Sequence, residues 1–208
     1  MTKKRSTNPP AQIRNDGDSA LIKAIQAGTG TGFDDLISRY EKRLYNFGLR
    51  MCRNVGDAED LVQETFLNVV RYVDRFRFET QFKNWLYRIA ASVCIKKRRR
   101  SKYAPEQEIS LDEIVPQEAA IAASRLPDWA TLPLPQLLNE ELRRVIGDGI
   151  HALPAHYRLV VNLRDVEGFS TEETAQILGI SEANVKVRLH RARHFLRQKL
   201  QHYFNDET

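Results

Sequence analysis

The sequence predicts an all-α protein made of two small helical domains, joined by an acidic linker that contains proline. Apolar residues recur every three or four positions from residue 18 to 97 and again from about 137 to 203, the spacing of one buried helix face. No stretch alternates apolar and polar residues over the length of a strand. Five prolines lie between residues 103 and 135, and compact domains rarely contain a structureless stretch of that length. We therefore place a domain boundary there.

The N-terminal domain, residues 18–102, follows a tail at 1–17 that we expect to be disordered. Asp18 is expected to cap the first helix, and glycines between residues 28 and 32 separate it from the second. Asp57 is expected to cap the third, whose first turn carries acids that the helix dipole favours. A loop at 76–81 precedes the fourth. The expected helices span residues 18–26, 33–51, 57 to about 73, and 82 to about 99.

Beyond this domain we expect the linker at 103–136, with one short helix near 117–124, and then the C-terminal domain at 137–204. The net charge of +5, from 32 basic and 27 acidic side chains, is segregated. Residues 96–102 carry six basic and no acidic side chains, residues 103–141 one basic and eight acidic, and residues 181–208 six basic and three acidic. Two basic segments suggest two contacts with nucleic acid. Two solvated helix faces would leave the same pattern, and charge alone leaves both interpretations open.

Several classes of protein are disfavoured. No apolar run reaches the ~18–20 residues of a membrane span, so no membrane insertion is expected. The basic start lacks the apolar segment of a signal peptide. Cys52 and Cys94 stand alone, which favours neither a disulfide framework nor a metal clamp. The missing signal peptide and the two lone cysteines favour a cytoplasmic protein. No catalytic motif is present, so we expect that the protein is not an enzyme and needs no cofactor or metal.

The C-terminal domain carries the signals of a helix-turn-helix. Ser170 with Glu173 forms a capping box that opens a short helix. Gly179 ends that helix, because glycine tolerates a positive φ, and Ser181 caps the next. Two short capped helices around a glycine turn are typical of this DNA-binding unit.

The second of these helices has a core face and a polar face. A helical wheel buries Val185, Leu189, Ala192, Leu196 and Leu200. On the opposite side Arg191 is suited to guanine, Asn184 to adenine and Val187 to a thymine methyl group. Lys186, Arg188 and Arg193 are placed for phosphates. His190 and His194 have a spacing that can bind a metal, but no further ligand accompanies them.

The helix from residue 57 has an acidic face opposite its apolar one. Asp57, Asp60, Glu64 and Leu67 share this face, with Gln63 beside it. An exposed leucine among carboxylates is what a docking surface for a basic partner helix shows. On pattern alone, a solvated acidic face is the likelier interpretation.

The segment 76–88 interleaves aromatic residues with arginine. The wheel buries Phe82 and Leu86 and places Trp85 at the edge. Exposed aromatics beside arginine can stack on unpaired bases or hold an extruded base. The helix then continues into a basic stripe, Lys96–Lys102, suited to phosphates. The residues expected to face outward are Asn84, Tyr87, Arg88 and Ala91.

These segments resemble a known family. DAEDLVQETF (57–66) and FKNWLYRIA (82–90) are similar to region 2 of the extracytoplasmic-function (ECF) sigma factors. LPAHYR (153–158), GFSTEETA (168–175) and VKVRLHRAR (185–193) are similar to region 4. Both sets occur in the family's order, and the resemblance covers about residues 18–203. It implies a dissociable initiation subunit of bacterial RNA polymerase that binds promoter DNA.

The resemblance also implies site residues and partners. The acidic face would dock on the clamp helices of the largest polymerase subunit, region 4 on the flap, and an anti-sigma factor would bury both regions. The linker's charge suits the polymerase active-site channel. The implied polymerase-binding residues are Asp57, Asp60, Leu61, Gln63, Glu64 and Leu67. The implied minus-ten residues are Phe76, Arg77, Phe78, Thr80, Asn84, Trp85, Arg88, Lys96, Lys97 and Arg98. The implied minus-thirty-five residues are Thr171, Asn184, Lys186, Val187, Arg188, His190, Arg191 and Arg193.

One alternative is a helix-turn-helix regulator that acts without docking on polymerase. It accounts for residues 170–193 but gives 57–100 no role. An enzyme that uses the aromatic loop is a weaker alternative, because no nucleophile or metal site accompanies the loop.

Overall fold

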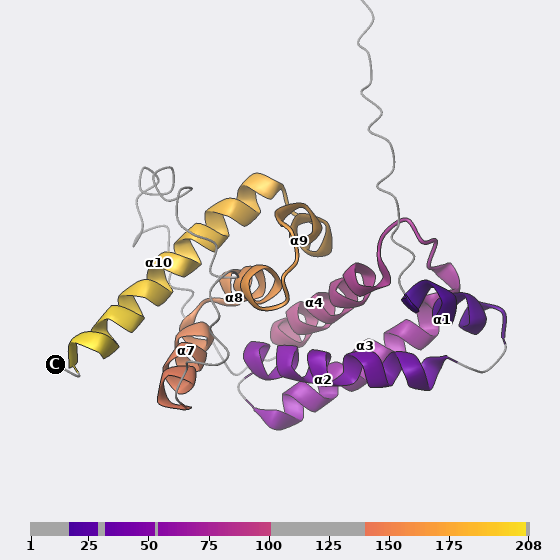
Figure 1. Cartoon of the computed structure of the whole chain (residues 1–208), viewed down its shortest axis with the longest axis horizontal. Helices are drawn as coiled ribbons and strands as arrows, with labels where there is room; N and C mark the ends of the chain where they lie inside the picture. Colours follow the sequence, from indigo (N-terminus) through magenta and orange to yellow (C-terminus); the bar gives the residue numbers. More distant parts are fainter. Residues whose placement is uncertain (1–16, 29–31, 53, 101–139, 207–208) are drawn as a thin grey trace, which may run out of the picture.

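A computed structural model describes residues 17–28, 32–52, 54–100 and 140–206. Every regular element in these ranges is helical (Figure 1), which confirms the all-α prediction. None of these helices is long and apolar enough to cross a membrane. The N-terminal module comprises α1 (Gly17–Gln26), α2 (Phe33–Met51), α3 (Val55–Tyr72), the 3-10 turn η1 (Val73–Arg75) and α4 (Phe82–Arg100). The C-terminal module comprises α7 (Glu140–Ala152), α8 (Ala155–Val161), the π-helical turn η5 (Asn162–Val166), α9 (Thr171–Leu178) and α10 (Glu182–Asp206).

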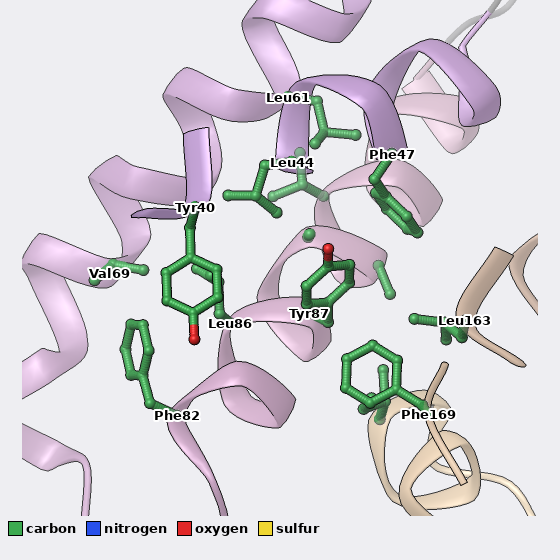
Figure 2. Packing of buried hydrophobic residues seen from close by; sticks show 14 of the residues in the cluster. Tyr40, Leu44, Phe47, Leu61, Val69, Phe82, Leu86, Tyr87, Leu163 and Phe169 are labelled. Carbon is green, nitrogen blue, oxygen red and sulfur yellow. The ribbon is translucent and has the colours of Figure 1, made fainter. Parts of the chain in front are cut away.

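The core of the N-terminal module lies between α2, α3 and α4 (Figure 2). The periodic stripe from Phe33 to Met51 supplies the α2 side, as the spacing predicts. Gly48 sets the approach of α2 to α3, because a Cβ there would lie 3.1 Å from the Cα of Ala58. The buried residues that α2, α3 and α4 contribute to this core include Leu36, Tyr40, Leu44, Phe47, Leu61, Val69 and Leu86.

The C-terminal module contains the predicted helix-turn-helix. The Ser170 hydroxyl accepts from the Glu173 amide, and the Glu173 carboxylate accepts from the Ser170 amide, so the capping box is present. Gly179 has φ 66°, and the Ser181 hydroxyl accepts from the Asn184 amide at 3.2 Å. The α10 residues Val185, Leu189 and Ala192 are buried against α8 and α9, as the wheel predicts.

The two modules lie against each other in Figure 1. Leu159, Leu163, Phe169 and Ile177 of the C-terminal module belong to the same buried cluster as the N-terminal core. The Phe169 ring packs edge-on against Tyr87 at 5.0 Å between centroids. No pattern in the sequence predicts this contact. The expected tail, linker and linker helix lie outside the described residues.

Two helix starts differ from expectation. Asp18 does not cap α1: it lies inside the first turn, 4% exposed, and its carboxylate binds Arg39 and the Tyr40 hydroxyl. Asn54, not Asp57, caps α3, since its side chain accepts from the Asp57 amide at 2.6 Å. In both cases an acid near the start of a helix serves a neighbour instead of its own backbone.

Candidate nucleic-acid interface

The acidic face of α3 forms one wall of a shallow surface groove. Asp60, Gln63, Glu64 and Leu67 line it together with Lys96 and Lys97 of α4. Leu67 is 57% exposed, which places an apolar side chain among carboxylates in the open. Leu61 is different from the rest of the predicted docking set, because it is fully buried in the core. Leu61 follows Asp60 directly, and neighbouring residues of a helix point in different directions, so its side chain lies on the apolar face of α3.

The two α4 lysines do not form an unpaired phosphate stripe. Lys97 Nζ lies 2.5 Å from an Asp57 carboxylate oxygen and 2.9 Å from one of Asp60. Lys96 reaches Glu64 only at 4.0 Å. The hydrogen bond from Lys97 holds the pKa of Asp57 below its usual range. Among the contacts of the described residues, Glu64 is therefore the docking-face carboxylate held most weakly by a lysine of the chain itself. The side chain of Arg98 lies outside the described residues.

The aromatic loop, residues 76–81, is folded around a cluster of rings. Phe76 is buried, and its ring lies 5.0 Å from Phe78 and 5.3 Å from Trp85. Arg77 and Thr80 are exposed, and Phe78 and Trp85 are partly exposed. The loop thus presents a mixed aromatic and cationic surface, with Phe76 as its internal support.

Most of the α4 residues that were expected to face outward are buried. Tyr87 is fully buried, Ala91 is 2% exposed, and Asn84 is 7% exposed with Nδ2 donating to Glu173 at 3.1 Å. Arg88 remains exposed. The prediction that Asn84, Tyr87 and Ala91 face outward is therefore wrong. Tyr87 packs edge-on against Phe47 of α2 at 5.4 Å between ring centroids and also meets Phe169 of the C-terminal module, a contact that a helical wheel of α4 alone could not show.

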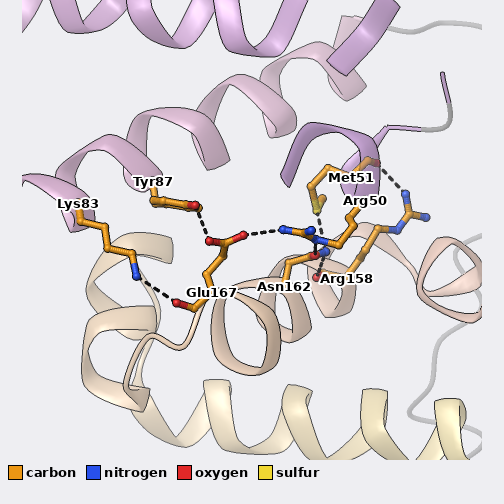
Figure 3. Close-up of polar contacts among 7 residues, drawn as sticks. All are labelled: Arg50, Met51, Lys83, Tyr87, Arg158, Asn162 and Glu167. Atoms are coloured by element: carbon orange, nitrogen blue, oxygen red, sulfur yellow. Dashed lines mark hydrogen bonds and ion pairs between the residues drawn. The ribbon is translucent and has the colours of Figure 1, made fainter. Parts of the chain in front are cut away.

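Glu167 is the centre of the polar contacts between the modules (Figure 3). Its carboxylate accepts from Arg50 Nη2 and from the Tyr87 hydroxyl, each at 2.5 Å. Its backbone oxygen accepts from Lys83 Nζ at 3.0 Å, and Arg50 Nε donates to Asn162 at 2.7 Å. Burial, then the Glu167 charge, raise the pKa of Tyr87, so its hydroxyl keeps its proton and donates.

A second contact joins the modules near the end of α2. Arg158, 5% exposed, donates from Nη1 to the Met51 carbonyl at 2.9 Å and from its other nitrogens to backbone oxygens of its own module. Sequence reasoning missed Arg158, Arg50 and Glu167 as contact residues. Their partners lie 80 to 117 residues away, and no periodicity reports on such pairs.

The polar face of α10 remains accessible over its first two turns. Asn184 and Lys186 are exposed, and Val187, Arg188, His190 and Arg191 are partly exposed. Arg193 is instead bound to Asp165, at 2.5 and 3.0 Å, so its predicted phosphate contact competes with an internal ion pair. Burial, and then the neighbouring His194, lower the pKa of His190. The remaining predicted contact, Thr171, is half-buried at the start of α9.

Comparison with known proteins is consistent across both modules. The family model for Sigma-70 region 2 matches residues 36–103, and that for Sigma-70 region 4 matches residues 143–196. The chain is 33% identical over 179 residues to the ECF RNA polymerase sigma factor SigW of Bacillus subtilis, covering 86% of this chain and 94% of that protein. It is 34% identical over 185 residues to the ECF RNA polymerase sigma-E factor of Haemophilus influenzae, covering 88% and 95%.

Two solved structures share the fold. CnrH, solved in complex with the cytosolic domain of CnrY, superposes with a TM-score of 0.63 at 25% identity over 89% of this chain and 98% of that one. The sigma factor RpoE of Bartonella quintana, solved with the anti-sigma factor NepR, gives a TM-score of 0.59 at 22% identity over 81% and 96%.

Proposed function

The chain belongs to the ECF family of RNA polymerase sigma factors, and on that premise we propose how its two modules direct promoter-specific transcription initiation. The observation that carries the proposal is the pairing of two surfaces on one chain: the acidic groove with exposed Leu67, and the polar face of α10. A regulator that only bound DNA would need the second surface and not the first. Action on the bacterial chromosome places the protein in the cytoplasm.

We assign polymerase docking to the α3 groove. Asp60, Gln63, Glu64 and Leu67 offer carboxylates around an apolar centre, which suits the clamp helices of the largest subunit. Asp57 acts from the edge of this surface and shares Lys97 with Asp60. Leu61 supports the surface from the core. We assign binding of the polymerase flap to the C-terminal module, on the basis of the family resemblance.

We assign minus-ten recognition to the aromatic loop and the start of α4. Arg77, Phe78, Thr80 and Trp85 offer stacking and polar groups to an extruded base, with Arg88 beside them. Phe76 supports the loop from beneath. Lys96 and Lys97 would reach phosphates only by leaving the carboxylates they now face.

We assign minus-thirty-five recognition to α10 entering the major groove. Asn184, Lys186 and Val187 lie in its first turn and a half, where a recognition helix meets base edges. Arg191 and His190 follow one turn later, and Arg188 flanks them. Because Arg193 is bound to Asp165, its part is to fix α10 on the module rather than to meet DNA.

In the structure the C-terminal module packs against α4, an arrangement that we call closed, and it covers one of the residues assigned to the minus-ten element. Asn84 is covered by Glu173, and its buried Oδ1 has no hydrogen-bond partner within the described part of the chain. A buried acceptor without a partner costs free energy. The two modules must separate before Asn84 can meet an opened strand. The 39 residues at 101–139 could span at most about 130 Å fully extended, which permits the separation.

An anti-sigma factor is the partner expected to oppose that separation. The sigma factor RpoE of Bartonella quintana, which shares the fold, is solved in complex with the anti-sigma factor NepR. We propose that a protein of this kind binds the present chain with its modules together, so that α4 stays covered.

Co-purification with core RNA polymerase followed by run-off transcription tests the function. Glu64→Ala should weaken core binding about tenfold, because Glu64 is the carboxylate least engaged by the chain's own lysines. Glu41→Ala, which removes an exposed carboxylate from α2, is the matched control and should not. DNA binding by the wild type without core binding or transcription would favour the regulator instead.

A further inference from the structure

Gln26, the last residue of α1, joins that helix to the segment that begins the aromatic loop. Its Nε2 donates to the Val73 carbonyl at 2.7 Å and to the Phe76 carbonyl at 3.0 Å. These partners lie 47 and 50 residues further along the chain. We propose that Gln26 is a positioning residue that sets the conformation of the aromatic loop and thereby its choice of base in the minus-ten element. The proposal rests on the function proposed for that loop.

The chemistry of this contact requires an amide of this length. Both neighbours are carbonyl oxygens, so the group that meets them must donate twice, and a primary amide nitrogen carries two N–H bonds. The Val73 oxygen also accepts from the Phe76 amide at 3.0 Å. Gln26 therefore completes the hydrogen bonding of η1, the turn from which the loop departs. Glutamate at this position would place an acceptor against two acceptors.

The loop needs such external support. Phe78 has φ 58°, a left-handed conformation that a residue with a side chain rarely adopts. The ring of Phe76 is packed between Phe78 and Trp85. A second residue of α1, Lys23, places its Nζ 5.7 Å from the centre of the Phe78 ring. Helix α1 thus contacts both the start of the loop and its strained residue.

From this geometry, α1 acts on base choice without touching DNA. When Gln26 loses its two bonds, Phe76 and the turn beneath the loop are no longer held, and Phe78 can relax from its left-handed conformation. Arg77 and Phe78 then no longer present one fixed pocket to the extruded base. Selection at that base falls, while the α3 groove and α10 keep their structures.

The experiment uses reconstituted holoenzyme and a promoter library randomised over the minus-ten element. Gln26→Met keeps the approximate size of the side chain and removes both N–H donors. Gln26→Glu also keeps the size and removes both donors, and it adds a negative charge. The same two substitutions at Ala20, an exposed residue of α1, are the controls. In both Gln26 variants the preference for the favoured base over the other bases at one minus-ten position should fall about tenfold, the loss expected from two ordinary hydrogen bonds. Core binding and minus-thirty-five selection should be unchanged.

A direct measure of the loop accompanies the transcription assay. With Trp129→Phe, Trp85 is the only tryptophan of the chain, and its ring reports on Phe76. Its emission should change in the Gln26 variants and not in the Ala20 variants, at an unchanged helical circular dichroism signal.

The outcomes separate this inference from the proposed function. Gln26 variants that keep wild-type selection would overturn the role of Gln26. So would variants that lose core binding, minus-thirty-five selection and helicity together, since that is a loss of fold. Phe78→Ala serves as the reference for the loop itself. If Phe78→Ala also keeps wild-type selection, the loop does not read the minus-ten element and the proposed function is wrong at that point.

Discussion

Glu167→Gln should release the C-terminal module from α4. The wild-type carboxylate accepts two hydrogen bonds of 2.5 Å, from Arg50 and Tyr87, and the side chain is only 9% exposed. Hydrogen bonds to a charged group contribute about 1.5–3 kcal/mol each. Glutamine keeps one acceptor oxygen and loses the charge that neutralises Arg50.

We therefore expect the closed arrangement to lose about 2–3 kcal/mol, which corresponds to a shift of about 30- to 150-fold toward separated modules. Energy transfer between dyes at positions 71 and 199, two exposed sites in different modules, measures this shift. The dyes are attached in a background in which Cys52 and Cys94 are replaced by alanine.

Glu172→Gln is the matched control, because Glu172 is exposed on α9 and accepts only a long hydrogen bond, 3.5 Å, from Gln176 of the same helix. It should keep the wild-type transfer efficiency. Equal efficiencies in Glu167→Gln and Glu172→Gln would refute the reasoning that Glu167 holds the modules together.

Three further predictions concern stability and pH. Gly48→Ala should destabilise the N-terminal module by about 1–3 kcal/mol in urea unfolding, because its Cβ would press on the Ala58 backbone at 3.1 Å; an unchanged midpoint would contradict this. Ser170→Ala should lower the free energy of unfolding by about 1 kcal/mol, because the α9 cap is lost, and should weaken minus-thirty-five binding in gel shifts. An unchanged free energy of unfolding would contradict the role of the cap. The lowered pKa of Asp57, due first to Lys97, means that its contribution to stability is complete above the unfolded carboxyl value near pH 4 and disappears as the pH falls through the folded value. The difference in thermal midpoint between wild type and Asp57→Asn should therefore be complete at pH 7 and shrink as the pH falls below about 4, and a difference that does not shrink would contradict the ion pair.

Local signals in the sequence were enough for most of the helices and for the caps of the helix-turn-helix, but not for the caps of α1 and α3. The apolar stripe of α2 predicts its bounds, Phe33–Met51, because burial of one face is a property of the helix itself. Ser170, Gly179 and Ser181 predict the helix-turn-helix because capping involves residues three or four apart. Such contacts are local in the chain, so a single sequence contains them.

Contacts between the modules could not be predicted in this way. Asn84 carries no sign that it meets Glu173 of α9, and Tyr87 carries none that it meets Glu167. Lys97 belongs to a basic run that suggests phosphates, yet carboxylates 37 and 40 residues earlier bind it first. In each case the deciding partner is distant in sequence, and only tertiary packing, within the N-terminal module for Lys97 and between the modules for Tyr87 and Asn84, brings it near.

Photo-crosslinking in one holoenzyme–promoter complex tests the central claim most directly. Crosslinkers replace Arg77 in the aromatic loop and Lys186 in α10, both of them exposed. We predict that position 77 captures the minus-ten element and position 186 the minus-thirty-five element, and that both crosslinks require core polymerase. A crosslink from position 186 alone, formed equally well without polymerase, would contradict the account.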